Sequence, residues 1–221
     1  MSILDVLGPV MIGPSSSHTA GAVRLGLLAR GILDDTVAEA EIYLHGSFAE
    51  TYKGHGTDMA LLAGLMGWKP DDGRIPQAME YAKEVGLKYK FIKTDLGDLA
   101  HPNTVLFKLT GVAGGVVEVT GSSIGGGQVL INNIDGMDME LTGKLPAILT
   151  THIDKRGVLS LISGILANAG VNIATMRLFR DDKGGMASMV IECDNEVPKW
   201  VLATLENLEF IINVRFVAKL L

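Results

Sequence analysis

The sequence predicts an α+β protein of two domains, with a mixed α/β domain first and a ferredoxin-like βαββαβ domain second. Two observations lead to this prediction. Turn and breaker residues, Thr-Gly-Lys-Leu-Pro, fill positions 142–146, which is typical of a boundary between domains. The part before them is rich in glycine, whereas the part after them has regular helix and strand periodicity. We therefore expect domains at 1–144 and 147–221.

The second part contains six segments in the order strand, helix, strand, strand, helix, strand. Apolar residues recur at helical spacing from 158 to 169, and Gly170 is suited to end that helix. A second helix is expected to begin near Pro198. The expected strands span 147–152, 171–180, 186–193 and 212–216, the last with Ile212, Val214 and Phe216 on one face. This order gives a four-stranded antiparallel sheet with both helices on one face.

The first part mixes helices and strands. Apolar periodicity predicts helices over 22–32, 58–66 and 75–85. The expected strands span 40–44, 88–93, 104–109, 116–119, 128–131 and 137–141, and the last three form a meander. The glycines of 121–127 are assigned to a flexible hairpin, because the Lys-Ser/Thr pair of a phosphate loop is missing.

The composition excludes several classes of protein. The chain has 221 residues, 48% of them hydrophobic, and a formal net charge of −6 without a cluster of Lys and Arg. It can bury a substantial core, and it lacks the charge pattern for binding nucleic acid. No segment reads as a signal peptide or membrane span, so we expect a cytoplasmic protein. The single cysteine, Cys193, is expected to be buried, and alone it cannot hold an iron–sulfur cluster.

A polar motif precedes the first helix. Positions 13–19 read Gly-Pro-Ser-Ser-Ser-His-Thr. Hydroxyls and an imidazole at a helix start favour binding of a carboxylate or phosphate, because unpaired backbone N–H groups point there. In the alternative interpretation, a Ser or Thr merely caps the helix and His18 is exposed.

A second polar cluster spans 45–58 and is expected to be a loop between a strand and a helix. It supplies two imidazoles, His45 and His55, and several charged groups, although Asp58 could simply cap the next helix. A metal site made from the two histidines lacks a supporting spacing. A hydrolase triad of Ser16, His55 and Asp58 lacks a nucleophile elbow.

Taken together, these motifs resemble those of a known family. The heptad, His-Gly-Ser at 45–47 and Lys-Gly-His-Gly-Thr-Asp at 53–58 resemble the β subunits of bacterial iron–sulfur L-serine dehydratases. Residues 152–159 and 168–173 resemble an ACT domain. The resemblance implies a substrate-binding-type first domain and a partner α subunit that ligates a [4Fe–4S] cluster. Together the two subunits would convert L-serine to pyruvate and ammonia.

The resemblance also implies roles for individual residues. The candidate catalytic residues are His55, His18 and His45, with His55 the preferred base and His45 its alternative. The candidate substrate-binding residues are Ser15, Ser16, Ser17, Thr19, Gly46, Ser47 and Asp58. The candidate effector-binding residues of the ACT domain are Asp154, Arg156, Gly157 and Asn172. Self-association through the ACT domain is expected, and no metal ligand is expected in this chain.

A non-catalytic subunit that senses an amino acid is the main alternative. It accounts for the ACT-like segment and for the lack of cysteines. It does not explain two histidine-bearing polar segments in the other domain. A stand-alone hydrolase is the third alternative.

Overall fold

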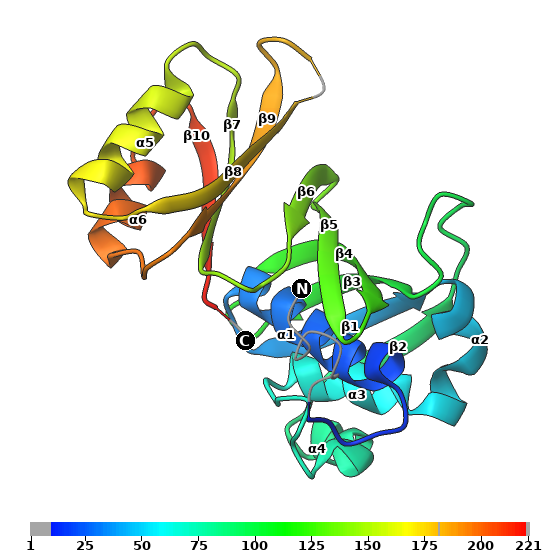
Figure 1. Ribbon diagram of the computed structural model, residues 1–221. Coiled ribbons are helices and arrows are strands. Elements are labelled where there is room, and N and C mark those ends of the chain that lie inside the picture. The colour runs from blue at the N-terminus through cyan, green and yellow to red at the C-terminus, as the bar shows by residue number, and fades with distance from the viewer. Residues whose placement is uncertain (1–9, 181, 220–221) are drawn as a thin grey trace. The chain divides into compact units, whose positions relative to one another are not determined.

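The computed structural model describes residues 10–180 and 182–219. The chain forms two compact units, 1–135 and 136–221, each with its own sheet (Figure 1). These units differ from the domain limits expected from the sequence only in the segment 136–146, and those limits stay a prediction. No helix in the described ranges has the length and apolar character needed to cross a membrane.

The first unit is a mixed α/β layer. Its elements are a π-helical turn Ser16–Gly21, α1 (Ala22–Leu33), β1 (Val37–Leu44), α2 (Gly46–His55), α3 (Thr57–Leu65), a 3-10 turn Ile75–Gln77, α4 (Ala78–Glu84), β2 (Lys88–Lys93), β3 (Thr104–Gly111), β4 (Val116–Gly125) and β5 (Gln128–Ile134). With β6 (Met137–Leu141), the strands form a sheet in the order β2-β1-β3-β4-β5-β6. Strand β1 pairs in parallel with β2 and antiparallel with β3. The mixed fold and the strands expected in this part are confirmed.

The backbones of helices α1 and α3 lie in direct contact with each other. A Cβ on Gly26 of α1 would lie 2.6 Å from the Leu61 carbonyl oxygen and 2.9 Å from the Gly64 Cα. A Cβ on Gly64 would likewise overlap the Val23 carbonyl oxygen. The two helices therefore approach this closely only because glycine faces glycine.

The cluster at 45–58 is helical, so its assignment to a loop was wrong. Residues Gly46–His55 form α2, and Gly56, with φ of 67°, separates it from α3. Phe48 and Ala49 are buried and supply the apolar side of α2, while the rest of the helix is polar. The density of polar residues obscured this short apolar face, because only two of its positions carry buried side chains.

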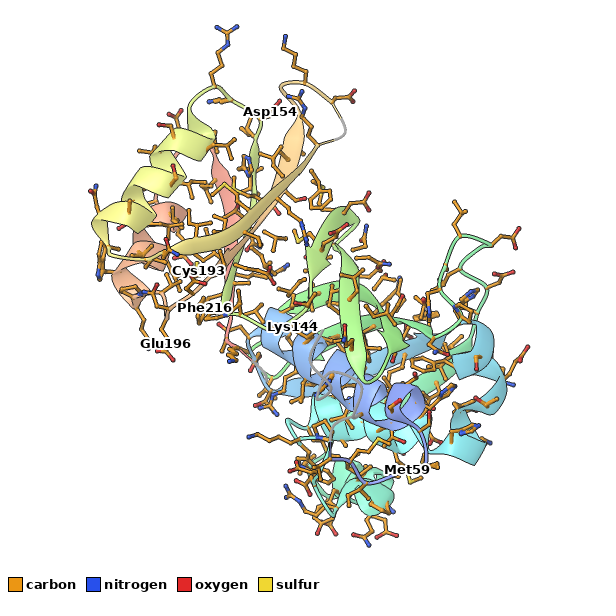
Figure 2. All side chains as sticks on the ribbon, in the orientation of Figure 1. Met59, Lys144, Asp154, Cys193, Glu196 and Phe216 are labelled. Atoms are coloured by element: carbon orange, nitrogen blue, oxygen red, sulfur yellow. The ribbon has the colours of Figure 1, made fainter. Side chains whose placement is uncertain are left out.

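The second unit has the expected ferredoxin-like order. Its elements are β7 (Ala147–Ile153), α5 (Val158–Asn168), β8 (Ile173–Arg180), β9 (Met186–Cys193), α6 (Lys199–Glu206) and β10 (Ile211–Val217). The sheet order is β10-β7-β9-β8, and both helices lie on one face (Figure 1). Cys193 is buried in the core between this face and the helices (Figure 2). This burial confirms the expected buried cysteine, and it raises the pKa of the thiol to about 11, which disfavours the reactive thiolate.

In the last strand, the side chain of Ile212 points away from the face on which it was predicted. The pairing of β10 with β7 shifts register between Ile211 and Asn213, as at a β-bulge. Ile211, Val214 and Phe216 consequently pack against the core, whereas the side chain of Ile212 is 56% exposed. Strict alternation of side chains along the strand predicts that Ile212 faces the core. The extra residue at the bulge interrupts this alternation, so Ile212 faces solvent instead.

Candidate active site

The serine-rich motif starts α1 through an unusual turn. Ser15 is the N-cap residue, and its Oγ accepts a hydrogen bond from the His18 backbone N–H at 3.1 Å. Residues Ser16–Gly21 then form a π-helical turn that continues into α1. At Gly21 a Cβ would overlap the Ser123 side chain, so β4 approaches this turn closely. The capping interpretation is confirmed for Ser15, and the wide turn is of a type frequent at functional sites.

His18 connects the motif to α2. Its Nδ1 lies 3.4 Å from the Ser15 hydroxyl and its Nε2 lies 3.1 Å from the Ser47 hydroxyl. Its ring meets the edge of Phe48 at 5.2 Å and lies 4.9 Å from the ring of His55. Partial burial, and then the charge of His55, lower the pKa of His18. A neutral His18 with one donating and one accepting nitrogen fits this arrangement.

A pocket of about 260 Å³ opens beside these rings. Thr19, Lys53, His55 and Met59 line it, together with residues 12–14 and 75–76. The Thr19 side chain is 2% exposed, and its hydroxyl has no hydrogen-bond partner among the described residues. The side chains of Lys53, His55 and Thr19 therefore line one small cavity, although the Thr19 hydroxyl oxygen is itself buried. A cationic side chain and an imidazole at this cavity suit a small anionic substrate.

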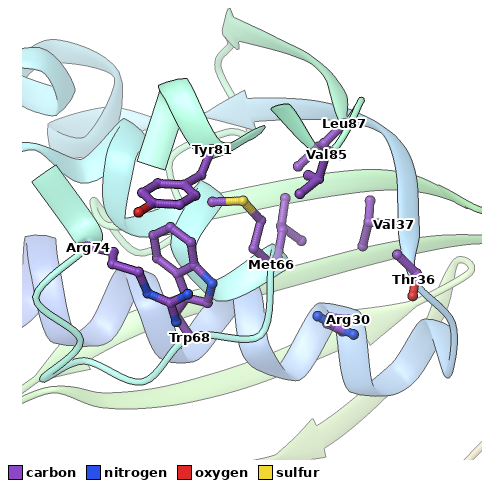
Figure 3. A pocket seen from close by; sticks show the side chains of 10 residues that line it. Arg30, Thr36, Val37, Met66, Trp68, Arg74, Tyr81, Val85 and Leu87 are labelled. Atoms are coloured by element: carbon purple, nitrogen blue, oxygen red, sulfur yellow. The ribbon is translucent and has the colours of Figure 1, made fainter. Parts of the chain in front are cut away.

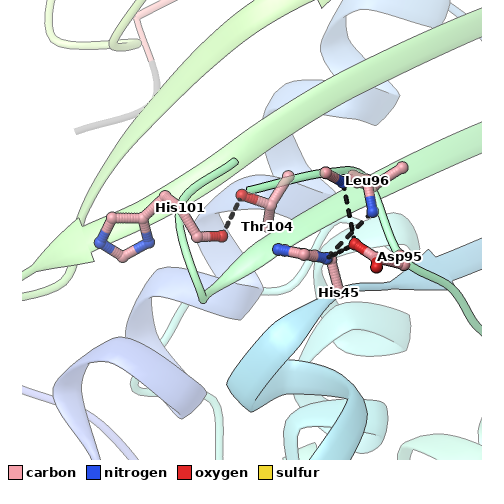
Figure 4. Close-up of polar contacts among 6 residues, drawn as sticks. His45, Asp95, Leu96, His101 and Thr104 are labelled. Carbon is pink, nitrogen blue, oxygen red and sulfur yellow. Dashed lines mark hydrogen bonds and ion pairs between the residues drawn. The ribbon is translucent and has the colours of Figure 1, made fainter. Parts of the chain in front are cut away.

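His55 and His45 lie in different surroundings. His55 is exposed at the pocket, and within the described part of the chain its ring takes part in no hydrogen bond. His45 is the residue before α2, and its Nδ1 accepts the Leu96 backbone N–H at 3.1 Å and lies 3.6 Å from Asp95 (Figure 4). Because Nδ1 of His45 is an acceptor already in use, His55 is better placed to accept a proton.

Three other candidates have structural contacts. Asp58 is buried and accepts the Met59 backbone N–H at 2.9 Å, and burial raises its pKa. No hydrogen bond joins Asp58 to His55 in the described ranges, and Ser16 lies in the π-helical turn. Gly46, with φ of 53°, lets the backbone pass Pro102, whose carbonyl oxygen would lie 2.7 Å from a Cβ at this position.

Sequence reasoning missed several residues of the pocket. Lys53 was seen only as one charge in a polar cluster, and residues 75–76 were treated only as a helix start. Pro76 lies at the beginning of a short 3-10 turn, and that pattern has no functional signature. Ser17 lies in the π-helical turn and is half-buried, with no lining contact to this pocket.

The candidate effector-binding residues of the ACT domain do not all lie together within one chain. The Asp154 carboxylate accepts hydrogen bonds from Arg180 at 2.8 Å and from the Gly184 backbone N–H at 3.1 Å. Asn172 is hydrogen-bonded to Asp194. The eleven residues of α5 separate these two positions by about 16 Å at 1.5 Å per residue. Arg156 and Gly157 precede α5, so Asn172 could join them only from a second copy of the chain.

The residues present do not fit an iron–sulfur cluster. Such a cluster takes three or four thiolates, whereas this chain has one cysteine, and that cysteine is buried. The described residues also contain no group of three or more His, Cys, Asp and Glu side chains that could hold a metal ion. No reaction step of this chain is therefore assigned to a metal of its own.

The contact between His18 and His55 predicts that the charge of His55 influences the pKa of His18. We expect the midpoint for His18, followed by NMR of its ring protons, to lie below the usual ~6.5 and to rise in His55→Gln, because a neighbouring positive charge is removed. The ring-proton signals of His101, an exposed residue before the turn at 102–103, are the internal reference. An unchanged His18 midpoint in His55→Gln would contradict the arrangement.

The lowered pKa of His18 also predicts how acid changes the free energy of unfolding. The unfolded chain binds a proton on His18 more readily than the folded chain does, so the free energy of unfolding should fall as the pH falls below the unfolded pKa. The contribution of His18 is fully present above that pH. Urea titrations at several pH values, with His18→Asn as the comparison, measure it.

The fold and this site define a class of protein. A small pocket lined by histidine, lysine and threonine in an α/β unit, followed by a ferredoxin-like unit, defines a two-module α+β protein with a candidate polar site in its first module. The family description "Serine dehydratase beta chain" matches residues 2–134, and the ACT domain matches 147–210. The chain belongs to the serine dehydratase beta chain family.

Individual relatives agree with the family. The chain is 39% identical over 216 residues to "L-serine dehydratase, beta chain" of Peptoniphilus asaccharolyticus, which covers 98% of this chain and 97% of the relative. It is 41% identical over 217 residues to "Probable L-serine dehydratase, beta chain" of Bacillus subtilis, which covers 98% of each. It is also 41% identical over 91 residues to "L-serine dehydratase 1" of Escherichia coli, which covers 38% of this chain and 20% of that protein.

Proposed function

We propose that this chain is the β subunit of an L-serine dehydratase, which with an α subunit converts L-serine to pyruvate and ammonia. The observation that carries the proposal is the pocket that His55, Lys53 and Thr19 line. The names of the full-length relatives supply the substrate. The match to the Escherichia coli protein occupies one fifth of its length, which supports a further chain as the source of the remaining machinery.

The side chains of the pocket suit the two ends of serine. The Lys53 ammonium would bind the substrate carboxylate, because an ammonium favours an anion. Ser15 and Ser47 contact the two ring nitrogens of His18, so this ring has a fixed position behind His55, which lines the pocket. Ser16 and Ser17, in the turn that follows Ser15, are candidates for orienting it.

His55 is the proposed base. Its imidazole would take the α-proton of serine while the bond between the β-carbon and the hydroxyl oxygen breaks, giving aminoacrylate and releasing the hydroxyl group as hydroxide. The cluster of the α subunit would supply the Lewis acid that makes this hydroxyl a leaving group. Aminoacrylate tautomerises to the imine, and water hydrolyses the imine to pyruvate and ammonia. A neutral His18 beside His55 helps this step, because it adds no repulsion when His55 becomes charged.

The [4Fe–4S] cluster of the proposed enzyme belongs to the α subunit. The support is the lack of thiolates in this chain, which has one buried cysteine. The substrate would then bind where this pocket faces the partner. We assign binding, orientation and proton transfer to this chain alone.

Protection from chemical modification tests the proposed substrate site. The complex with the α subunit, purified without oxygen, is treated with diethyl pyrocarbonate, and acylation of each histidine is followed by mass spectrometry. His55 and His101 are both exposed in this chain, but only His55 lines the pocket. L-serine should slow acylation of His55 and leave His101 unchanged. Equal acylation of His55 with and without serine would contradict the proposal.

Self-association through the ACT domain is part of the same proposal. Strand β8 is at an edge of its sheet and pairs only with β9, and Leu178 on this strand is 37% exposed. A second copy could add its own β8 and bring Asn172 toward Asp154 and Gly157. Charge on an edge strand opposes such pairing. Leu178→Lys should therefore shift the sedimentation coefficient to that of a smaller assembly, whereas Trp200→Lys on α6 should not.

The amino-acid sensor stays the second candidate, because the chain contains an ACT domain. Calorimetry of L-serine binding to the complex with the α subunit distinguishes the two functions. A sensor that uses only its ACT domain would bind L-serine with the same affinity after His18 and His55 are both replaced. The dehydratase proposal predicts that these replacements weaken serine binding to the assembled enzyme.

A further inference from the structure

A second pocket lies in the first unit, where α1 ends and β1 begins. It has a volume of about 310 Å³ and shares no lining residue with the histidine pocket. Figure 3 shows the rings of Trp68 and Tyr81 toward one end, Arg30 and Thr36 toward the other, and Met66 between them. The proposed dehydratase reaction uses none of these residues.

The walls of this pocket are mainly apolar. The Trp68 and Tyr81 rings meet edge to face with centroids 5.2 Å apart, and Met66 and Val37 continue the surface. Arg74 also lines the pocket, but its guanidinium stacks on Trp68 at 4.3 Å and is paired with Asp72 at 2.7 Å. Its charge is therefore already matched, and the stacked group extends the flat wall.

Arg30 is different, because its charge is not matched. Its side chain makes no hydrogen bond or ion pair with any described residue, although it is only partly exposed. It lies against Gly67, where a Cβ would be 2.5 Å from Nη1. Asp35 accepts the backbone N–H groups of Thr36 and Ala113 at 2.6 and 2.8 Å, and Asp72 pairs with Arg74. Asp34 ends α1 four residues after Arg30, but no ion pair joins the two side chains in the described part of the chain.

We propose that this pocket binds a small monocarboxylate with a branched or aromatic hydrocarbon body. The carboxylate would pair with Arg30, whose planar fork of N–H donors fits two carboxylate oxygens. The body would lie along Met66 and the ring of Trp68. Serine lacks such a body, and a dicarboxylate would place its second charge against apolar walls at a cost in desolvation.

Fluorescence of Trp68 tests the proposal in the full chain. The protein has two tryptophans, and Trp200→Phe leaves Trp68 as the only one. Titration with 3-phenylpropionate should change its emission with saturation, whereas 3-phenylpropan-1-ol should bind at least tenfold more weakly and acetate should have no effect. Arg30→Gln should weaken binding of 3-phenylpropionate at least tenfold, and Lys199→Gln, at an exposed cation at the start of α6 in the other unit, should not. Equal binding of acid and alcohol, or full affinity in Arg30→Gln, would overturn the proposal.

A second measurement needs no change at Arg30. In the unmodified chain with labelled methionine methyl groups, 3-phenylpropionate should shift the NMR signal of Met66. Met59 lines the histidine pocket and serves as the internal control. A shift of Met59 without Met66, or of neither methyl group, would show that the ligand does not occupy this pocket. Both measurements use the isolated chain, so their outcome is independent of the dehydratase proposal.

Discussion

Replacing His55 by alanine is expected to lower kcat for pyruvate formation by the α–β complex about 10²- to 10⁴-fold, the usual contribution of a positioned proton acceptor. The reason is the geometry of the first unit. His55 is the exposed imidazole at the pocket, and it lies beside the His18 ring, whose pKa is lowered. KM for L-serine should change much less, because Lys53 would still bind the carboxylate.

Two other histidines are the controls for this experiment. His101→Ala changes an exposed residue outside the pocket and should leave kcat within about twofold, since most surface substitutions have small effects. His45→Ala should lower the rate less than His55→Ala, because its Nδ1 is held by the Leu96 backbone N–H. Near-normal turnover in His55→Ala, or a larger loss in His45→Ala, would reject His55 as the base.

Gly64→Ala is expected to destabilise the first unit. The loss of stability should be larger than for alanine at a helical glycine of the same unit that lies outside the α1–α3 contact. Alanine is intrinsically better than glycine in a helix by about 1 kcal/mol, so the substitution alone favours folding. Here, however, the new methyl group would overlap the backbone of Val23 and lie 2.9 Å from the Gly26 Cα. Backbone cannot rotate away as a side chain can, so α1 and α3 must separate. We expect a net loss of about 2 kcal/mol, within the range for overpacked cores.

Gly54→Ala is the matched control. Gly54 is in α2 of the same unit, and a Cβ there would meet nothing within 4 Å. This variant should be as stable as the unaltered chain or slightly more so. Urea-induced unfolding followed by circular dichroism compares the two variants directly. Equal stability of Gly64→Ala and Gly54→Ala would contradict a backbone contact between α1 and α3.

The fold was largely predictable because its elements are long or strongly periodic. The βαββαβ unit follows from apolar spacing over 158–169 and from breakers at both ends of each strand, and the structure confirms its topology. The facing of Ile212 was not predictable, since a bulge depends on how β10 pairs with β7 rather than on its own sequence. The helix α2 was missed because only Phe48 and Ala49 mark its buried side.

The site was predictable in part. The serine-rich motif and the segment with His55 each carried a chemical signal, and the structure brings the His18 and His55 rings to 4.9 Å. Lys53 and the turn at Ile75–Gln77 gave no such signal, because their place at the pocket depends on how α2 and the segment after α3 fold against each other. The pairing of Asp154 with Arg180 likewise depends on a loop whose shape the sequence does not specify.

Pyruvate formation from L-serine tests the central claim most directly. The chain and a cysteine-rich α subunit are produced together without oxygen, purified as a complex, and assayed alongside each component alone. We expect turnover only when both chains are present, because the described pocket supplies substrate-binding and proton-accepting groups while the chain lacks the thiolates for a cluster. Full activity of the α subunit alone, or no activity of the complex with an intact cluster, would contradict a catalytic role for this chain.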